Sequence, residues 1–393
     1  MRYKRLAVAL VAILLFAGAG AVYLLRDPLP HFLARRSSLA SVTEGARIVD
    51  PEYILTPVRL TAASGLAVDL MVRRPIADSG RRLPLAVILG GHYTGRKAVD
   101  RLGPARGVIV AALSYPFGGD PRPDALTFLR EIPKIRGAFL DTPPAIMLAL
   151  DYLRKQPDVD TTRVEAIGVS LGAPFICIAG ALDPRFTRVW AIHGSGGSYV
   201  PLEANMKRNI PIAPVRALAA GIANVIISGP RLDPIHWVPK ISPRPFVMVN
   251  ASDDERMPRP AVDALYASAR EPKEIVWMSG RHVHSDRETI QRLVAIVMGR
   301  MRGESPSANY HALGSVAAAP PSYETRGAWK THPYDTTSPS RSTRSWSRSA
   351  TTAPCSPPSC AAACRTTRCG PNPTSTSSSS RSMTGRFRPA ASR

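Results

Sequence analysis

The feature that most constrains the fold is an alternation of short apolar runs with segments of helical periodicity across the middle of the chain. Residues 85–89 form a continuous apolar run, which is typical of a strand buried on both faces. Further on, Ile146, Leu150 and Leu153 recur at helical spacing after two prolines. Other segments with strand-like composition lie at 66–71, 107–115, 163–169, 188–193, 245–250 and 274–278. This alternation predicts an α/β fold with a mostly parallel central sheet and helices on both faces.

The N-terminal segment, residues 1–26, has the composition of a membrane anchor or an export signal. Residues 6–25 carry no charge and follow Arg2, Lys4 and Arg5, so we expect the N-terminus to stay in the cytoplasm. The length of the run favours a transmembrane helix, but small residues near its end also resemble a signal cleavage site. Both alternatives predict a catalytic domain outside the cytoplasm, either tethered to the membrane or secreted, in the periplasm or extracellularly.

The remaining chain divides at changes of composition. We expect a linker over residues 27–52, a folded domain over 53–303, and a disordered tail over 304–393. The tail is rich in Ser, Thr and Pro and has almost no core-forming residues, so it cannot offset the entropy of ordering. Its four cysteines lack the paired spacing of zinc sites. A change of reading frame is an alternative origin for this tail.

The net charge of +22 would suggest a nucleic-acid partner if it were spread over a folded surface. Much of it lies elsewhere, since the tail is strongly basic and Arg2, Lys4 and Arg5 precede the apolar run. We therefore predict no nucleic-acid partner. The sequence leaves the oligomeric state open.

The segment Gly168-Val169-Ser170-Leu171-Gly172 matches the G-x-S-x-G pattern of a nucleophile elbow. The pattern alone is common, because glycine and serine are abundant residues. Its context is more demanding, since the serine must stand on a sharp turn between a strand and a helix. A predicted strand precedes Ser170 and a helix of small residues follows it. We therefore predict that Ser170 is a catalytic nucleophile.

An acid and then a histidine should follow such a serine along the chain. His193 comes too early, which leaves His282 and His284 in the folded part as candidate bases. The acid should follow a strand, and the loop after residues 245–250 offers Asp253 and Asp254. The residues alone leave both pairs of alternatives open.

At this point the chain resembles the α/β-hydrolases over residues 58–301, and the run 158–164 into the elbow is most similar to the dienelactone-hydrolase and acetyl-xylan-esterase branch. That resemblance implies an α/β-hydrolase fold. It favours Asp254 as the acid, because Pro258 follows it four residues later as in the family. The sequence departs from the family at Ala251, where the family has glycine. The family's histidine often follows Gly-x, which favours His282.

The resemblance also implies an oxyanion hole, formed by two backbone N–H groups that stabilise the developing negative charge. One is the N–H of Leu171, the residue after the nucleophile. The other is the N–H of His92, with Tyr93 as the alternative, in the loop after residues 85–89. The family's usual histidine is replaced here by Gly90, so His92 is alternatively a polar residue of the pocket.

These residues together predict a serine hydrolase that cleaves carboxylic esters of small molecules without a cofactor or metal. Alternatives on the same triad are a thioesterase, a peptidase or an acyltransferase. A non-catalytic α/β-hydrolase-like binding protein is a further alternative, although such relatives usually lose a triad residue. Residues 195–241 interrupt the regular alternation and predict a lid-like insertion. Their apolar side chains favour lipophilic esters, or else pack only with one another.

Overall fold

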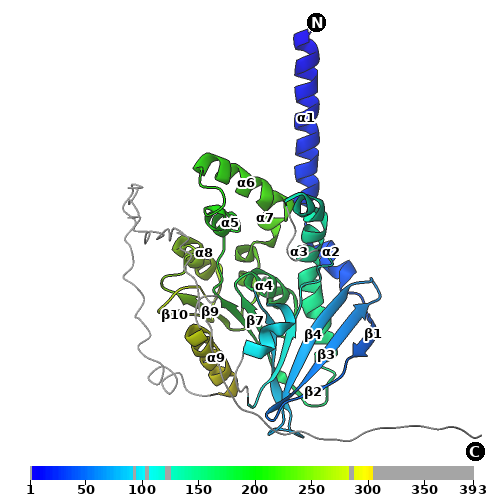
Figure 1. The fold of residues 1–393 in the computed structure, drawn as a ribbon, viewed down its shortest axis with the longest axis vertical. Helices are drawn as coiled ribbons and strands as arrows, with labels where there is room; N and C mark the ends of the chain where they lie inside the picture. Colours follow the sequence, from blue (N-terminus) through cyan, green and yellow to red (C-terminus); the bar gives the residue numbers. More distant parts are fainter. Residues whose placement is uncertain (1, 92–93, 102–105, 120–124, 283–286, 304–393) are drawn as a thin grey trace, which may run out of the picture. The chain divides into compact units, whose positions relative to one another are not determined.

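A central sheet organises the fold in a computed structural model of the chain (Figure 1). The structure describes residues 2–91, 94–101, 106–119, 125–282 and 287–303. The strands in these ranges are β1 (Leu39–Glu44), β2 (Ile48–Val49), β3 (Tyr53–Ala62), β4 (Ala67–Pro75), β5 (Leu83–Leu89), β6 (Ile109–Leu113), β7 (Val159–Val169), β8 (Arg188–Ile192), β9 (Phe246–Ala251) and β10 (Lys273–Met278).

All of these strands belong to one sheet in the order β1-β3-β4-β6-β5-β7-β8-β9-β10, with β2 paired to β3. The pairings of β1, β2 and β4 with β3 and of β4 with β6 are antiparallel. Every pairing from β6 through β5 to β10 is parallel. The mostly parallel sheet predicted from the sequence is therefore confirmed. The carboxyl ends of the parallel strands meet at one edge of the sheet, where such sheets bind ligands.

Helices cover both faces of the sheet, as predicted. The helices and 3₁₀ turns described are α1 (Arg2–Leu24), α2 (Leu29–Arg35), η1 (Gly95–Arg101), α3 (Ala125–Leu153), α4 (Gly172–Leu182), α5 (Tyr199–Met206), α6 (Ala213–Ile226), α7 (Gly229–Leu232), η2 (Pro234–His236), η3 (Val238–Lys240), α8 (Arg259–Ser268) and α9 (Arg287–Arg302). Residues of α2, α3, α4 and α8 share one buried apolar cluster, and those of η1 and α9 share another. Along β5, Leu85 and Val87 face the first cluster while Ala86 and Ile88 face the second, because successive side chains of a strand alternate.

The insertion expected at 195–241 corresponds to α5, α6, α7, η2 and η3, which lie between β8 and β9. The buried side chain of Asp233 ties its two ends together. Its carboxylate accepts hydrogen bonds from the backbone N–H groups of Gly197 at 3.1 Å, Ser198 at 2.6 Å and Ile235 at 3.2 Å. Asp233 therefore holds the first residues of the insertion next to its last turns.

The expected linker over residues 27–52 is wrong, because most of this segment is built into the domain. Helix α2 buries Phe32 completely, with its ring 6.0 Å from that of Trp237. Arg35 binds Asp141 through two hydrogen bonds of 2.9 and 2.7 Å. Strand β1 then pairs with β3 at the edge of the sheet. The partners of this segment lie far away along the chain, so the composition of the segment itself does not reveal them.

Helix α3 also differs from the expectation that a helix begins at the two prolines before Ile146. The helix runs from residue 125 to 153 and contains Pro133, Pro143 and Pro144. A proline inside a helix removes its own N–H donor and its ring crowds the carbonyl four residues earlier, which costs about 3 kcal/mol. Burial of the following turn, which includes Ile146 and Leu150, stabilises the helix on the far side of the prolines.

Helix α1 displays exposed apolar side chains, among them Leu10, Leu14, Leu15 and Val22. The predicted membrane-spanning helix finds no support among the described residues, where no helix is both long and apolar enough to cross a bilayer. Several side chains of the uncharged run, at positions 6–9, 13, 16 and 17, lie outside the described set. The expected tail over 304–393 lies outside the described residues.

Candidate active site

Ser170 stands on the sharp turn that joins β7 to α4. Its backbone has a φ of 54°, in the left-handed region that residues other than glycine rarely adopt. Two glycines allow this turn. A Cβ on Gly168 would lie 2.6 Å from the Cα of Ala173, and a Cβ on Gly172 would lie 2.1 Å from the carbonyl oxygen of Leu89. The G-x-S-x-G spacing is thus what the close packing of helix against sheet requires.

The three residues predicted as a triad lie within hydrogen-bonding distance of one another. Ser170 Oγ is 2.9 Å from His282 Nε2, and His282 Nδ1 is 2.9 Å from each carboxylate oxygen of Asp254. Ser170, His282 and Asp254 come from loops that follow β7, β10 and β9, at the same edge of the sheet. Of the two candidate acids, Asp254 contacts the histidine, whereas the exposed Asp253 accepts a hydrogen bond from the Ser252 hydroxyl at 2.9 Å.

The loop after β9 holds Asp254 through its own backbone. Oδ1 of Asp254 accepts hydrogen bonds from the N–H groups of Arg256 at 2.9 Å and Met257 at 3.0 Å. An aspartate often stabilises a tight turn in this way. The neighbouring Glu255 accepts a 3.2 Å hydrogen bond from the backbone N–H of His282. The loop therefore fixes both the carboxylate and the backbone of the histidine that it contacts.

A second histidine contacts the same carboxylate, and the sequence reasoning missed it. His193 Nδ1 is 2.7 Å from Oδ2 of Asp254, and its ring centroid is 4.8 Å from that of His282. The residue follows β8, has a left-handed φ of 47° and is almost fully buried. Chain order excluded it as the base, but its place directly after a parallel strand is a signal that could have found it.

The charges at this site favour an ionised acid and a neutral second histidine. Burial acts to raise the pKa of Asp254, but hydrogen bonds from His193 and His282 and the nearby imidazoles outweigh it, so this pKa is held well below its usual range. Burial lowers the pKa of His193. The hydrogen bond to Asp254 acts to raise this pKa, and the neighbouring His282 lowers it further. At neutral pH the carboxylate is therefore charged and the His193 imidazole is not.

These protonation states determine the direction of every hydrogen bond in the group. An ionised carboxylate only accepts, so the Nδ1 atoms of His193 and His282 both carry the proton and donate to Asp254. In the neutral form of His282 its Nε2 is then the unprotonated nitrogen, and it faces the hydroxyl of Ser170. This arrangement can remove the proton from the serine hydroxyl, which is the requirement for a serine nucleophile.

The predicted oxyanion residues are only partly within the described chain. The backbone N–H of Leu171, at the start of α4, donates to no acceptor in the described part of the structure, which leaves it available to a ligand. His92, its alternative Tyr93, and His284, the second candidate base, lie outside the described residues.

Two cavities meet at Ser170. The larger has a volume of about 370 Å³ and lies between the sheet edge and the insertion. Its lining is mainly apolar and includes Phe139, Leu171, Phe175, Leu202, Ile227, Leu232 and Met257. The smaller, of about 100 Å³, lies on the side of α9 and is lined by residues such as Ile88, Leu293 and Val297. The serine hydroxyl is therefore reached from an apolar space, as in sites for apolar small molecules.

His193, Asp254 and His282 are also the residues of the described chain grouped closely enough to hold a metal ion, with ligand atoms within 4.8 Å of one another. The distances of 2.7 to 2.9 Å between the carboxylate and both imidazoles are those of hydrogen bonds. A metal would need the Nδ1 atoms that donate to Asp254 to be unprotonated. The donor set therefore fits a hydrogen-bonded triad better than a metal centre.

A scan against models of known protein families finds no match, and neither does a search of curated proteins. Solved structures do match. A methylesterase aligns with a TM-score of 0.51 and 15% identity, covering 76% of this chain and 66% of its own. Acetyl xylan esterases from a Thermoanaerobacterium species and a Paenibacillus species align with TM-scores of 0.49, at 15% and 17% identity. They cover 65% and 67% of this chain and 88% and 90% of their own. The match to the methylesterase shows that the two chains share a fold, and the mostly parallel sheet covered by helices on both faces agrees with the predicted α/β-hydrolase fold.

Proposed function

We propose that this protein is a serine hydrolase that cleaves carboxylic esters. One observation carries the proposal: Nε2 of His282 lies 2.9 Å from the hydroxyl of Ser170, beside a largely apolar cavity. The esterase names among the structures with a similar fold agree with this reaction class.

The reaction would proceed through an acyl-enzyme. Ser170 Oγ attacks the ester carbonyl carbon while its proton passes to Nε2 of His282. Asp254 stabilises the imidazolium that forms, and the N–H of Leu171 donates to the developing oxyanion. His282 then protonates the leaving alcohol, and the acyl group remains on Ser170. A water molecule, deprotonated by His282, attacks the acyl-enzyme; the bond to Ser170 Oγ breaks, His282 returns the proton to that oxygen, and the carboxylic acid is released.

His193 would act in this reaction as a positioning residue. It donates to Oδ2 of Asp254, while the turn at Arg256 and Met257 donates to Oδ1. The carboxylate is thereby fixed from two sides as it accepts from His282. A triad acid that cannot rotate keeps the imidazole in the tautomer and orientation that the serine needs.

The substrate class that fits the larger cavity is an ester with an apolar acyl or alcohol group. Leu202, Ile227 and Leu232 of the insertion contribute to the lining. The described lining residues include no acidic side chain, and Arg256 is their one cation. We therefore expect catalytic efficiency to rise with acyl length in a series of nitrophenyl esters, and a flat profile would exclude an apolar specificity pocket.

The nucleophile is tested by labelling with a fluorophosphonate probe. The wild type should be labelled, and Ser170→Ala should not. Ser195→Ala is the matched control, because Ser195 lines the same cavity and its hydroxyl donates to the sulfur of Met257. Equal labelling of Ser170→Ala and wild type would overturn the proposal, and loss of labelling in both variants would show that any change to the cavity abolishes it.

We further propose that residues 1–26 attach the enzyme to a membrane or direct its export, with the catalytic domain outside the cytoplasm. The uncharged run over 6–25, the preceding basic residues and the exposed apolar side chains of α1 support this. Membrane fractionation combined with the mass of the N-terminal peptide separates an anchor from a cleaved signal. Recovery of the uncleaved chain in the soluble cytoplasmic fraction would refute both.

A further inference from the structure

The helix α6 of the insertion presents an apolar face that no described residue covers. Ile212, Val215, Leu218 and Ile222 are each more than half exposed. Their spacing of three and four residues places them on one side of the helix. The opposite side packs against the domain through the buried Ala220 and Asn224. An exposed apolar face of this kind marks a surface for a partner.

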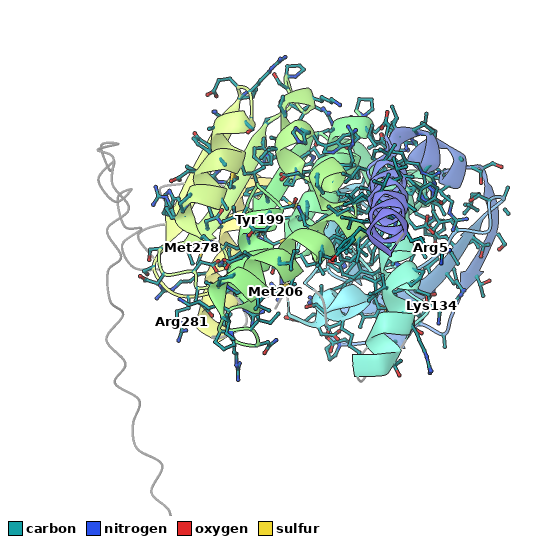
Figure 2. The ribbon with its side chains drawn as sticks, turned by 90° about the horizontal axis from the view of Figure 1, so that it is seen from above. Arg5, Lys134, Tyr199, Met206, Met278 and Arg281 are labelled. Atoms are coloured by element: carbon teal, nitrogen blue, oxygen red, sulfur yellow. The ribbon has the colours of Figure 1, made fainter. Side chains whose placement is uncertain are left out.

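The C-terminal end of α1 is bonded to the same part of the insertion. The carbonyl of Leu24 accepts hydrogen bonds from Ser228 at 2.8 Å and Arg136 at 3.1 Å, and that of Leu25 accepts one from Arg231 at 2.6 Å. Contacts also join α1 to α6 directly. Helices α1 and α6, which both carry exposed apolar side chains, thus meet at one end of the domain (Figure 1). Figure 2 looks down onto this end, with α5 between its labelled residues Tyr199 and Met206 and α1 at Arg5 both in view.

The exposed charged side chains of the insertion are basic. Lys207, Arg208, Arg231 and Lys240 are exposed within residues 199–240. The two acidic residues of this range are engaged elsewhere, since Glu203 pairs with Arg216 and Asp233 binds backbone N–H groups. A helix with an apolar face and basic neighbours is typical of one that lies in the interface of a bilayer with anionic headgroups.

From these observations we propose that α6 lies in the surface of the lipid bilayer beside α1, with its apolar face at the boundary between headgroups and acyl chains. This inference rests on the membrane attachment proposed above. The occupant is a lipid surface because α6 contacts the apolar helix α1, both helices carry exposed apolar side chains, and the exposed charged side chains of the insertion are basic.

This placement has a consequence for the substrate. The segment after α6 provides Ile227, Gly229 and Leu232 to the lining of the cavity over Ser170. A helix held in the bilayer surface would therefore place one wall of the cavity next to the lipid phase. Esters dissolved in the membrane become the expected substrates, rather than esters dissolved in water.

The experiment measures the depth of α6 in the membrane. A bimane fluorophore is attached at Leu218→Cys in the full chain, reconstituted into vesicles that contain anionic lipid. The cysteines of the tail are replaced by serine, and Cys177 is buried and inert. Two further sites serve as controls. Leu14→Cys on the exposed side of α1 reports the anchor, and Val42→Cys on β1 reports a surface with no predicted lipid contact.

We expect the probe at 218 to be quenched by lipids spin-labelled near the headgroup more than by lipids labelled deep in the acyl chains, because interfacial helices lie about 5–10 Å into the boundary. The probe at 14 should be quenched and the probe at 42 should not. Quenching at 14 without quenching at 218 overturns the inference and leaves the anchor intact. Absence of quenching at both sites overturns the anchor as well. Stronger quenching at 218 by the deep label also overturns the inference.

A kinetic measurement separates this inference from the proposed reaction. Leu218→Glu should retain wild-type turnover of a water-soluble nitrophenyl ester, since Leu218 does not line the cavity over Ser170. The same variant should lose activity on an ester embedded in vesicles. Equal activity of variant and wild type on the embedded ester contradicts the inference, whatever the outcome for the soluble ester.

Discussion

The second histidine on the triad acid gives the sharpest test of the site. His193→Phe removes the Nδ1–H that donates to Asp254 at 2.7 Å, and keeps an aromatic ring in the same buried position. A hydrogen bond to a charged group is worth about 1.5–3 kcal/mol. Since about 1.4 kcal/mol corresponds to a tenfold change in rate, the loss of kcat should be roughly 10- to 150-fold if the whole effect falls on the transition state.

The assay is steady-state hydrolysis of a nitrophenyl ester, with the active fraction measured by fluorophosphonate labelling. We expect kcat to fall and KM to stay, because other residues form the lining of the cavity over Ser170. His193→Asn is the matched variant. Its side-chain amide nitrogen replaces Nδ1 as donor, and asparagine tolerates the left-handed φ of 47°. It should restore most of the lost activity.

Two results would refute this reasoning. Wild-type kcat in folded His193→Phe would mean that the hydrogen bond to Asp254 does not contribute to catalysis. Equal losses in His193→Phe and His193→Asn, with unfolding temperatures close to that of the wild type, would mean that the donor is not the important property of the residue.

Three further predictions concern stability, each measured by urea unfolding. Gly172→Ala should lower the free energy of unfolding by about 1–3 kcal/mol or more, because the added Cβ would meet a backbone carbonyl. The control Gly221→Ala should raise it by roughly 0.5–1 kcal/mol, because a Cβ at this helical position meets no other atom. Phe32→Ala should lower the free energy of unfolding by about 3–5 kcal/mol, because Phe32 is fully buried. The control Leu33→Ala should lower it by less than about 0.5 kcal/mol, because Leu33 is exposed. Similar values for the two variants would contradict the docking of α2. The pKa of His193 is lowered in the folded state, so its neutral form stabilises the fold above pH 6.5 and this contribution is lost as the pH falls below 6.5. The free energy of unfolding should therefore fall with pH below 6.5, and it should fall less steeply in His193→Asn; identical slopes would exclude His193 as the cause.

The elbow and the parallel strands could be predicted because their determinants are local. Gly168 is needed because Ala173 of the following helix approaches it closely, so this requirement appears in the sequence as fixed spacing around Ser170. Gly172 is needed because the carbonyl of Leu89, distant in the chain, approaches it on the neighbouring strand. The strand at 85–89 is recognisable because both of its faces are buried, which leaves no polar position in the run. Asp254 and His282 could be predicted from the order in which an acid and a base follow the serine, together with the family resemblance.

The role of His193 could not be derived from its surroundings in the sequence. Its partner Asp254 is 61 residues away, and the two meet because β8 and β9 are neighbours in the sheet. The order of residues that identifies a base gives no information about a second donor to the acid. The segment around Phe32 was likewise taken for a linker, because its partners on α3 and in the insertion are distant in the chain.

The sequence by itself therefore determined which residues are chemically equipped and where the buried parallel strands lie, since backbone geometry and periodicity are properties of neighbours along the chain. Only the tertiary structure decided which of those residues meet. The sheet order brings the ends of β7, β8, β9 and β10 together, and this sets Ser170, His193, Asp254 and His282 within hydrogen-bonding distance. It also joined the end of α1 to the insertion, and so placed the two exposed apolar surfaces at the same end of the domain. The physical reason is that strand pairing and helix packing join segments that are distant along the chain, and no local pattern specifies which of them will pair.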